Sequence, residues 1–198
     1  MAISERKIEE RKNRQELILS SALEVFKVQG LENSTMEEIA LKAGFGKATL
    51  YYYFRSKEEV FSGILENGWQ MLWFSLEPII SPNTSPRETF VQILLKIAEN
   101  IRNRPRLFEV LFNAHKIIVF EDEPWKKYQD RMYSTLHSLL EGGIKTGEFP
   151  NINPKLLFKA MGGLFMGIVL MGDRNKPISE KDIEALLTQL IMNPAQQQ

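Results

Sequence analysis

Apolar residues recur at helical spacing along most of this chain. The first clear case lies between residues 15 and 29, where one helix face carries Ile18, Ala22, Val25 and Phe26. Gly30 follows and predicts a left-handed cap that ends this helix. Two shorter helical patterns come next, over 35–43 and 46–54, joined by a turn rich in glycine. Two short helices joined in this way, with a third helix to bury their backs, predict a helix-turn-helix unit.

The second short helix is expected to have an inward and an outward face. Leu50, Tyr51 and Phe54 share one face, which we expect to dock inward. The outward residues are Ala48, Thr49, Tyr52 and Tyr53. Thr35 is a suitable N-cap for the first short helix, and the glutamates after it lie in the first turn, where negative charge is favourable.

Proline and glycine divide the rest of the chain into further helices. Their positions predict helices over 57–76, 86–103, 105–119, 121–145, 154–171 and 179–192. Ser56 is the expected N-cap of the first of these, and Ser179 forms a capping pair with Asp182 at the last. No stretch alternates convincingly like a strand. We therefore expect an all-α protein of about nine helices.

Composition narrows the class of protein further. Hydrophobic residues make up 43% of the chain, enough for a packed core. There is no cysteine, which excludes disulfides, thiolate metal sites and a cysteine nucleophile. The N-terminus is charged, and the longest uncharged apolar run, 160–172, is too short to cross a bilayer. We expect a soluble cytoplasmic protein with no membrane partner.

The charges balance in number but not in position. The chain has 25 basic and 25 acidic residues, yet residues 39–57 contain basic residues and no acidic one. The N-terminal segment adds Arg6, Lys7, Arg11, Lys12 and Arg14, against three glutamates. Such charges often form only a solvated helix face. Beside a helix-turn-helix pattern they favour a DNA-binding surface.

The N-terminal residues also match a known family. The matching positions, in order and spacing, are Ile18, Ala22, Phe26, Gly30, Thr35, Ile39-Ala40, Ala43-Gly44, Thr49-Leu50-Tyr51, Phe54 and Ser56-Lys57-Glu58. On these residues the chain resembles the TetR family of transcriptional regulators. The resemblance implies an N-terminal three-helix DNA-binding domain over 12–57 (motif 35–54) and a larger helical effector-binding and dimerisation domain over 58–198. Family members commonly have other residues at Gly46, Ala48 and Tyr53, so no relative's operator sequence carries over.

The helix positions and the resemblance together predict a DNA-binding set. Thr35 and Lys57 lie at helix N-termini, where backbone N–H groups and the helix dipole favour phosphate, and by position they resemble the family's backbone anchors. Tyr51 and Tyr53 would add hydroxyl contacts to phosphate. The base-reading candidates are Lys47, Ala48, Thr49 and Tyr52. The expected partner is duplex DNA with a palindromic or near-palindromic operator.

The last two helices, 154–192, carry a second functional indication. The first of them is apolar on most sides, which is typical of a helix that is buried all round. One interpretation is the core of a monomer. The resemblance implies instead that these helices pair with a second copy into a four-helix bundle, so we predict a homodimer. The predicted interface comprises Leu156, Ala160, Gly163, Leu164, Gly167, Ile168, Met171, Ile183, Leu186, Leu187 and Leu190.

Aromatic and methionine residues are concentrated after residue 58. Most of them are expected to be core, but a subset could line an apolar small-molecule site. The candidates are Trp69, Trp73, Phe90, Leu94, Phe108, Phe112, Met132, Phe158, Met161 and Phe165, with His115 or His137 as a polar group. The expected ligand is an apolar or amphipathic effector.

Enzyme chemistry is not indicated. The histidines lack metal-ligand spacing, and there is no phosphate-binding glycine loop or nucleophile motif, so we expect no enzyme, no cofactor and no metal. The leading hypothesis is a repressor that a small ligand releases from its operator. The alternative is an adaptor of the same fold that does not read DNA. Such an adaptor would be expected to lose Lys47, Thr49, Tyr52 and Lys57, and all of these are present.

Overall fold

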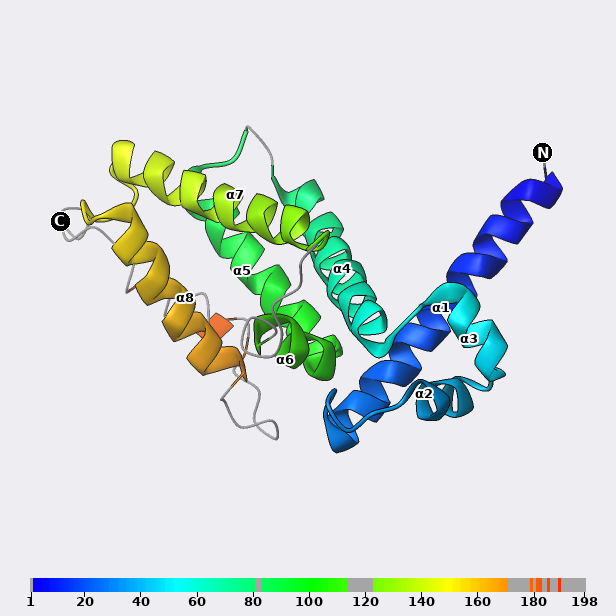
Figure 1. The fold of residues 1–198 in the computed structure, drawn as a ribbon. Coiled ribbons are helices and arrows are strands. Elements are labelled where there is room, and N and C mark those ends of the chain that lie inside the picture. Colours follow the sequence, from blue (N-terminus) through cyan, green and yellow to red (C-terminus); the bar gives the residue numbers. More distant parts are fainter. Residues whose placement is uncertain are drawn as a thin grey trace. The chain divides into compact units, whose positions relative to one another are not determined.

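The structure is a computed structural model that describes residues 2–80, 83–113 and 123–170, with Ser179, Lys181, Asp182, Ala185 and Gln189 beyond them. These residues form α-helices and one 3-10 turn, with no strand among them (Figure 1). The elements are α1 (Ala2–Gln29), α2 (Met36–Ala43), α3 (Lys47–Tyr53), α4 (Lys57–Leu76), η1 (Glu77–Ile79), α5 (Pro86–Asn103), α6 (Pro105–Asn113), α7 (Lys126–Lys145) and α8 (Pro154–Leu170). The predicted all-α class is confirmed.

The chain forms two compact units. The first comprises Met1–Gly68 with Val110–Trp125, and the second comprises Trp69–Glu109 with Lys126–Gln198. The helix α4 begins in the first unit and ends in the second. The domain boundary at 57/58 stays a prediction.

The first unit is built around the three predicted helices. Ile18 of α1, Ile39 of α2 and Leu50 of α3 are completely buried and form the centre of its core. The glycines that end α1 and α2 have left-handed backbones, with φ of 78° at Gly30 and 72° at Gly44, as a helix C-terminal cap requires. The helix-turn-helix geometry thus follows from caps and an apolar stripe that are visible in the sequence.

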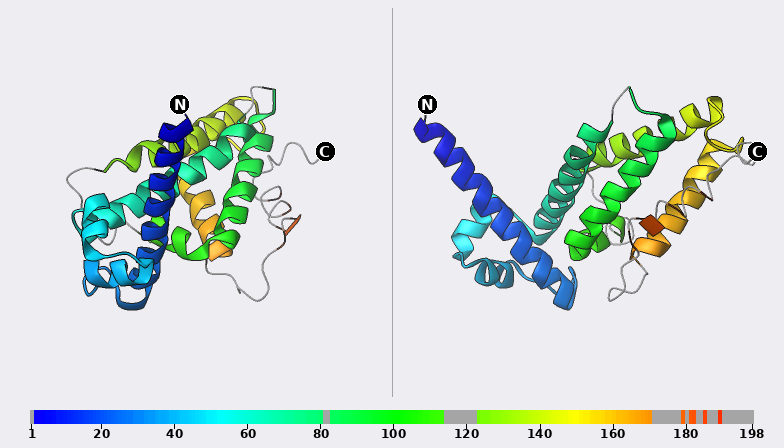
Figure 2. Two further views of the ribbon diagram at one scale, coloured as in Figure 1. Left: turned by 90° about the vertical axis from the view of Figure 1, so that its right-hand side faces the viewer. Right: turned by 180° about the vertical axis from the view of Figure 1, so that it is seen from behind.

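The helix α1 is longer than its apolar stripe indicated. It begins at Ala2, so the charged N-terminal segment is also helical, and its first turns project beyond α2 and α3 (Figures 1 and 2). Ion pairs at i,i+4 support this segment: Arg14 contacts Glu10 at 2.5 Å and Lys12 contacts Glu16 at 3.9 Å. A helix stabilised along its own surface needs no apolar stripe, which is why the pattern of apolar residues did not reveal it.

In the second unit α5, α7 and α8 pack together (Figure 2). Phe90 of α5 meets Phe149, which follows α7, edge to face at 5.7 Å between ring centroids. Gly143 of α7 lies so close to Phe149 that an added Cβ would overlap its ring. The absence of a side chain at this glycine therefore lets the chain after α7 fold back against the helix.

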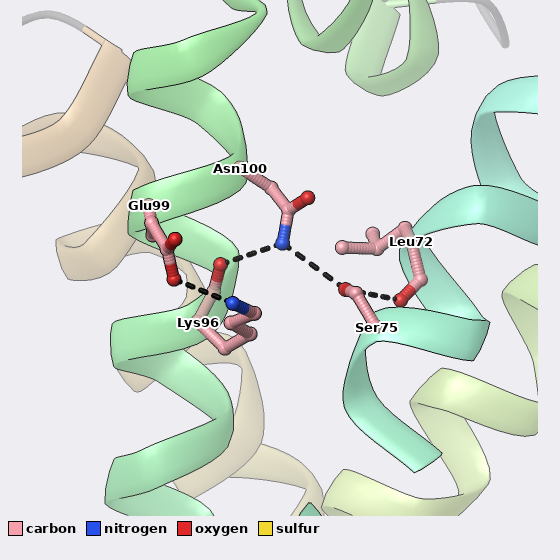
Figure 3. A network of polar contacts seen from close by, with 5 residues as sticks. All are labelled: Leu72, Ser75, Lys96, Glu99 and Asn100. Carbon is pink, nitrogen blue, oxygen red and sulfur yellow. Dashed lines mark hydrogen bonds and ion pairs between the residues drawn. The ribbon is translucent and has the colours of Figure 1, made fainter. Parts of the chain in front are cut away.

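A polar link joins α4 to α5 within the same unit (Figure 3). The Asn100 Nδ2 group of α5 donates to Ser75 Oγ at 3.0 Å and to the Lys96 carbonyl at 2.8 Å. Ser75 in turn donates to the Leu72 carbonyl at 2.7 Å. The side chain of Asn100 therefore ties the C-terminal half of α4 to α5.

Most predicted helix boundaries agree with the structure where it describes them, but the start predicted at residue 121 is wrong, because Pro124 and Trp125 form a turn and α7 begins at Lys126. The caps at Ser56 and Ser179 are confirmed: the Glu59 N–H donates to Ser56 Oγ at 3.2 Å, and the Asp182 N–H donates to Ser179 Oγ at 3.1 Å. The predicted end of the sixth helix after Asn113, and most of the last helix, lie outside the described residues. Along the described parts of the chain, no helix is both long and apolar enough to cross a membrane.

Candidate nucleic-acid interface

The recognition-helix candidate α3 buries a narrow stripe and exposes the rest. Leu50 and the capping residue Phe54 are buried, one helical turn apart. Ala48 and Tyr52 are exposed, the latter to 69%, and Thr49 and Tyr53 are half-buried. The expected inward docking of Tyr51 is wrong, because its side chain is 43% exposed. Tyr51 lies about 100° around the helix from Leu50, which takes it off the buried stripe.

Lys47, the first residue of α3, forms an ion pair with Glu37 of α2. The ammonium also lies 5.8 Å from the centroid of the Tyr51 ring. The hydrogen bond and charge of Glu37 raise the pKa of Lys47, and the hydrogen bond from Lys47 lowers the pKa of Glu37. Both groups are therefore ionised at neutral pH. Glu37 was not among the predicted site residues, because it precedes the acid-free stretch 39–57 in the sequence although it lies beside Lys47 in space.

Tyr52, another predicted base-reading residue, contacts two neighbouring side chains. The Arg11 guanidinium of α1 lies 5.6 Å from the centroid of its ring, within the range of a cation–π contact. Tyr53 meets the same ring edge to face at 5.1 Å. The positive charge of Arg11 was visible in the sequence, but only the packing of α1 on the other helices places it at Tyr52.

Thr35 caps α2 in the predicted way. Its hydroxyl is engaged in hydrogen bonds with Glu38. Thr35 Oγ1 accepts from the Glu38 N–H at 3.3 Å and donates to Glu38 Oε2 at 2.8 Å, and the Thr35 N–H donates to the same oxygen at 2.9 Å. This reciprocal capping box holds the pKa of Glu38 below its usual value, chiefly through the Thr35 hydroxyl and then its N–H. The Thr35 hydroxyl must therefore give up its hydrogen bond to Glu38 before it can donate to a phosphate.

Lys57, the other predicted phosphate anchor, also has a partner within the chain. Its ammonium donates to the Glu32 carbonyl at 2.7 Å, which connects the start of α4 to the segment between α1 and α2. An ammonium has three donors. Lys57 can therefore keep this hydrogen bond while it contacts a phosphate.

The predicted ligand residues differ in how far the structure buries them. Those that are buried are Trp69, Trp73, Phe90, Leu94, Phe108, Met132, Met161 and Phe165. Phe112, His137 and Phe158 are half-buried, and His115 lies outside the described residues. Phe90 packs on Phe149 in the core, and the Trp73 Nε1 group donates to Glu77 at 3.2 Å beneath the Arg131 guanidinium.

Three of these residues are nevertheless connected, through a residue that was not predicted. Tyr133 of α7 contacts Trp69 at 6.2 Å and Phe158 at 5.8 Å between ring centroids. His137 lies 6.4 Å from Phe158, and its Nδ1 is 3.5 Å from the Glu141 carboxylate. Burial, followed by the charge of Asp130, raises the pKa of the Tyr133 hydroxyl. This aromatic row of Trp69, Tyr133, Phe158 and His137 combines apolar rings with polar groups.

The helix α8 is not buried on all sides, contrary to its all-round apolar composition. Leu157, Met161 and Phe165 are buried, whereas Leu156 is 60% and Leu164 37% exposed. The other predicted interface residues with described side chains, Ala160, Gly163 and Gly167, are exposed or half-buried. The rest of the predicted interface, Ile168, Met171, Ile183, Leu186, Leu187 and Leu190, lies outside the described side chains. One side of α8 therefore packs on its own chain, and the other is an apolar surface.

Comparison with known proteins agrees with the helix-turn-helix geometry. Residues 18–64 match the family described as bacterial regulatory proteins, tetR family. YhgD of Bacillus subtilis (strain 168), an uncharacterised HTH-type transcriptional regulator, is 27% identical over 180 residues, covering 90% of this chain and 94% of YhgD.

Solved structures share the fold of most of the chain. The ketosteroid transcriptional regulator KstR2 of Mycobacterium tuberculosis has a TM-score of 0.77 at 19% identity, covering 91% of this chain and 95% of KstR2. AibR, solved in complex with isovaleryl coenzyme A and operator DNA, has a TM-score of 0.77 at 16% identity, covering 90% of this chain and 98% of AibR. YhgD and KstR2 are described as transcriptional regulators. The N-terminal residues of this chain thus match the tetR family of bacterial regulatory proteins, and the described chain shares the fold of TetR-family regulators.

Proposed function

We propose that this protein is a cytoplasmic repressor that binds a palindromic or near-palindromic operator as a homodimer and leaves it when a small molecule binds. The observation that carries the proposal is the exposed face of α3, where Lys47, Ala48 and Tyr52 project from a helix anchored by Leu50. An exposed helix of this kind fits the major groove. The rival adaptor function gives no reason to keep a basic and aromatic face on this helix.

The roles of the interface residues follow from their chemistry. Lys47 would donate to guanine acceptors, and the methyl groups of Ala48 and Thr49 would contact thymine methyl groups, beside Tyr52. Thr35, Tyr51, Tyr53 and Lys57 would contact phosphates, which fixes the register of the protein on the duplex but reads no bases. Lys57 suits this role best because it has donors left after its bond to Glu32.

The dimer is supported by the exposed apolar side of α8. Gly163 and Gly167 have open space where a Cβ would be. Two glycines one turn apart let a second helix approach closely, and the neighbouring Leu156 and Leu164 supply apolar area. A two-fold dimer presents two recognition helices to two half-sites, which accounts for the proposed operator symmetry.

The effector would bind in the second unit, at the aromatic row. Apolar rings with a few polar groups suit an apolar or amphipathic molecule. AibR, of the same fold, was solved with both an acyl coenzyme A and operator DNA. The helix α4 carries Lys57 at its first residue and Trp69 further along, so one helix joins the two proposed sites. A ligand can release DNA only if it binds more tightly to the state that does not bind DNA.

Selection from random duplexes tests the DNA-binding role. The full-length protein is expected to enrich one palindromic or near-palindromic sequence, whereas the adaptor hypothesis expects no enrichment. The enriched duplex then serves to screen apolar and amphipathic compounds for release, with the fluorescence of Trp69 and Trp73 as a measure of binding. A compound that saturates the protein and leaves operator affinity unchanged is not the inducer. Failure across broad libraries would indicate constitutive repression.

A further inference from the structure

The Glu37–Lys47 ion pair has no part in the core of the first unit. Glu37 is 54% and Lys47 61% exposed, and they come from two different helices, α2 and α3. Water and salt screen an exposed pair of this kind, so its contribution to stability is small. The pair instead sets a hydrogen-bond donor and an acceptor side by side at the start of the exposed recognition helix.

Glu37 and its neighbour Glu38 differ in the groups that donate hydrogen bonds to their carboxylates. Glu38 Oε2 accepts from Thr35 and from Gln29 Nε2, the latter at 2.8 Å, and so belongs to the helix cap. Among the described side chains the partner of Glu37 is Lys47. The Glu37 carboxylate can therefore exchange this partner for another donor without loss of a cap.

The edge of a base pair supplies such a donor. In the major groove a G·C pair presents the O6 and N7 acceptors of guanine beside the N4 amino donor of cytosine. An ammonium suits the two acceptors, and a carboxylate suits the amino group. At an A·T pair the ammonium would lose one of its two adjacent acceptors, and the carboxylate would face thymine O4 and its methyl group.

We propose that Glu37 and Lys47 act as a unit that reads one G·C base pair in each half-site, with Lys47 donating to guanine and Glu37 accepting from cytosine N4. The proposal rests on the DNA-binding function proposed above. Glu37 also disfavours other sequences, because a carboxylate without an amino partner is repelled by the surrounding phosphates. Glu37 is thus a specificity-determining residue on α2, outside the recognition helix.

The test compares selected sequences for full-length wild type, Glu37→Ala, Glu37→Gln and a control, Glu58→Ala. Glu58 is an exposed glutamate in the first turn of α4, so its removal changes the charge of the same unit by the same amount. We expect wild type to require a G·C pair at one position of each half-site. Replacing that pair by A·T should weaken wild type about tenfold, and Glu37→Ala should keep only the part of that discrimination that Lys47 supplies. Glu58→Ala should bind all sequences somewhat more tightly with the preference intact.

Base analogues isolate the atoms involved. Hypoxanthine in place of the guanine leaves the major-groove edge unchanged and should have little effect on wild type. N4-methylcytosine removes the major-groove hydrogen and should weaken wild type but not Glu37→Ala. Unchanged base preference in both Glu37 variants, with the wild-type operator still selected, would overturn the role of Glu37 and leave the DNA-binding function intact. If wild type selects no sequence, the proposed function itself fails. Circular dichroism of each variant checks that it is folded.

Discussion

At the scale of single residues, Lys57 joins a structural contact to a predicted phosphate contact. We expect Lys57→Ala to weaken binding to all duplexes alike and to reduce the slope of log K against log salt by about 0.9. Loss of the hydrogen bond to Glu32 should also lower the free energy of unfolding by about 1 kcal/mol. Fluorescence anisotropy at several salt concentrations measures the first effect and urea unfolding the second.

The control for Lys57 is Lys96→Ala, which removes a positive charge from α5, where Lys96 pairs with Glu99 at 2.7 Å. Lys96→Ala should leave the slope of log K against log salt unchanged. A loss of affinity in Lys57→Ala that depends on the base sequence would contradict the role of Lys57 as a phosphate anchor.

Because of Glu38, we expect the free energy of unfolding to depend on pH. Its pKa is lowered in the folded state, mainly by the Thr35 hydroxyl, so the ionised form stabilises the fold. This stabilisation is present above the ordinary glutamate pKa of 4.5 and is lost as the pH falls through the lower folded-state value. Glu38→Gln keeps a capping-box residue but not the charge. Urea unfolding between about pH 6 and about pH 3.5 should show a weaker pH dependence for this variant than for wild type or Glu58→Gln.

At the scale of elements, the N-terminal turns of α1 support the recognition helix through Arg11. Arg11→Gln removes the cation from the Tyr52 ring while keeping a long polar side chain. We expect it to weaken base preference at the position that Tyr52 reads. The matched control is Lys12→Gln, one residue along the same helix, where the lysine pairs with Glu16 instead. If Arg11→Gln and Lys12→Gln select the same sequences, Arg11 acts only through its charge and not through its contact with Tyr52.

The adjacent glycines of α7 should respond in opposite ways to the same substitution. A Cβ at Gly143 would overlap the Phe149 ring, whereas one at Gly142 would lie 3.5 Å from Pro86, an ordinary contact. Gly142→Ala should therefore raise the free energy of unfolding by up to about 1 kcal/mol through helix propensity. Gly143→Ala should lower it by about 1–3 kcal/mol because of overpacking. Thermal unfolding of both variants measures the difference, and equal effects would show that Phe149 moves freely.

At the scale of the whole molecule, the exposed side of α8 predicts the oligomeric state. Light scattering at micromolar concentration should give a dimer for wild type. Leu164→Lys places a charge on the apolar face and should give a monomer that binds the operator weakly. Val28→Lys makes the same change on α1, where Val28 is also exposed, and should leave the dimer intact. A wild-type monomer under these conditions would refute the proposed dimer and, with it, the paired half-sites.

Much of the fold could be predicted because its determinants are local. The caps at Thr35, Gly44 and Ser56 act within a few residues, and proline is the first residue of α5, α6 and α8. The same local rules were less informative for the site. The exposure of Tyr51 depends on how far the buried stripe around Leu50 extends, and the charged start of α1 has no apolar pattern to mark it.

By itself the sequence determined most of the helices, their caps and the helix-turn-helix unit, because helical periodicity and capping depend on neighbours within about four residues. Only the tertiary structure decided which side chains meet. It set Glu37 beside Lys47 and Arg11 over Tyr52, and it left one side of α8 uncovered. Such contacts depend on how helices distant in the sequence cross and which faces they bury, and the period of a single helix does not specify that packing.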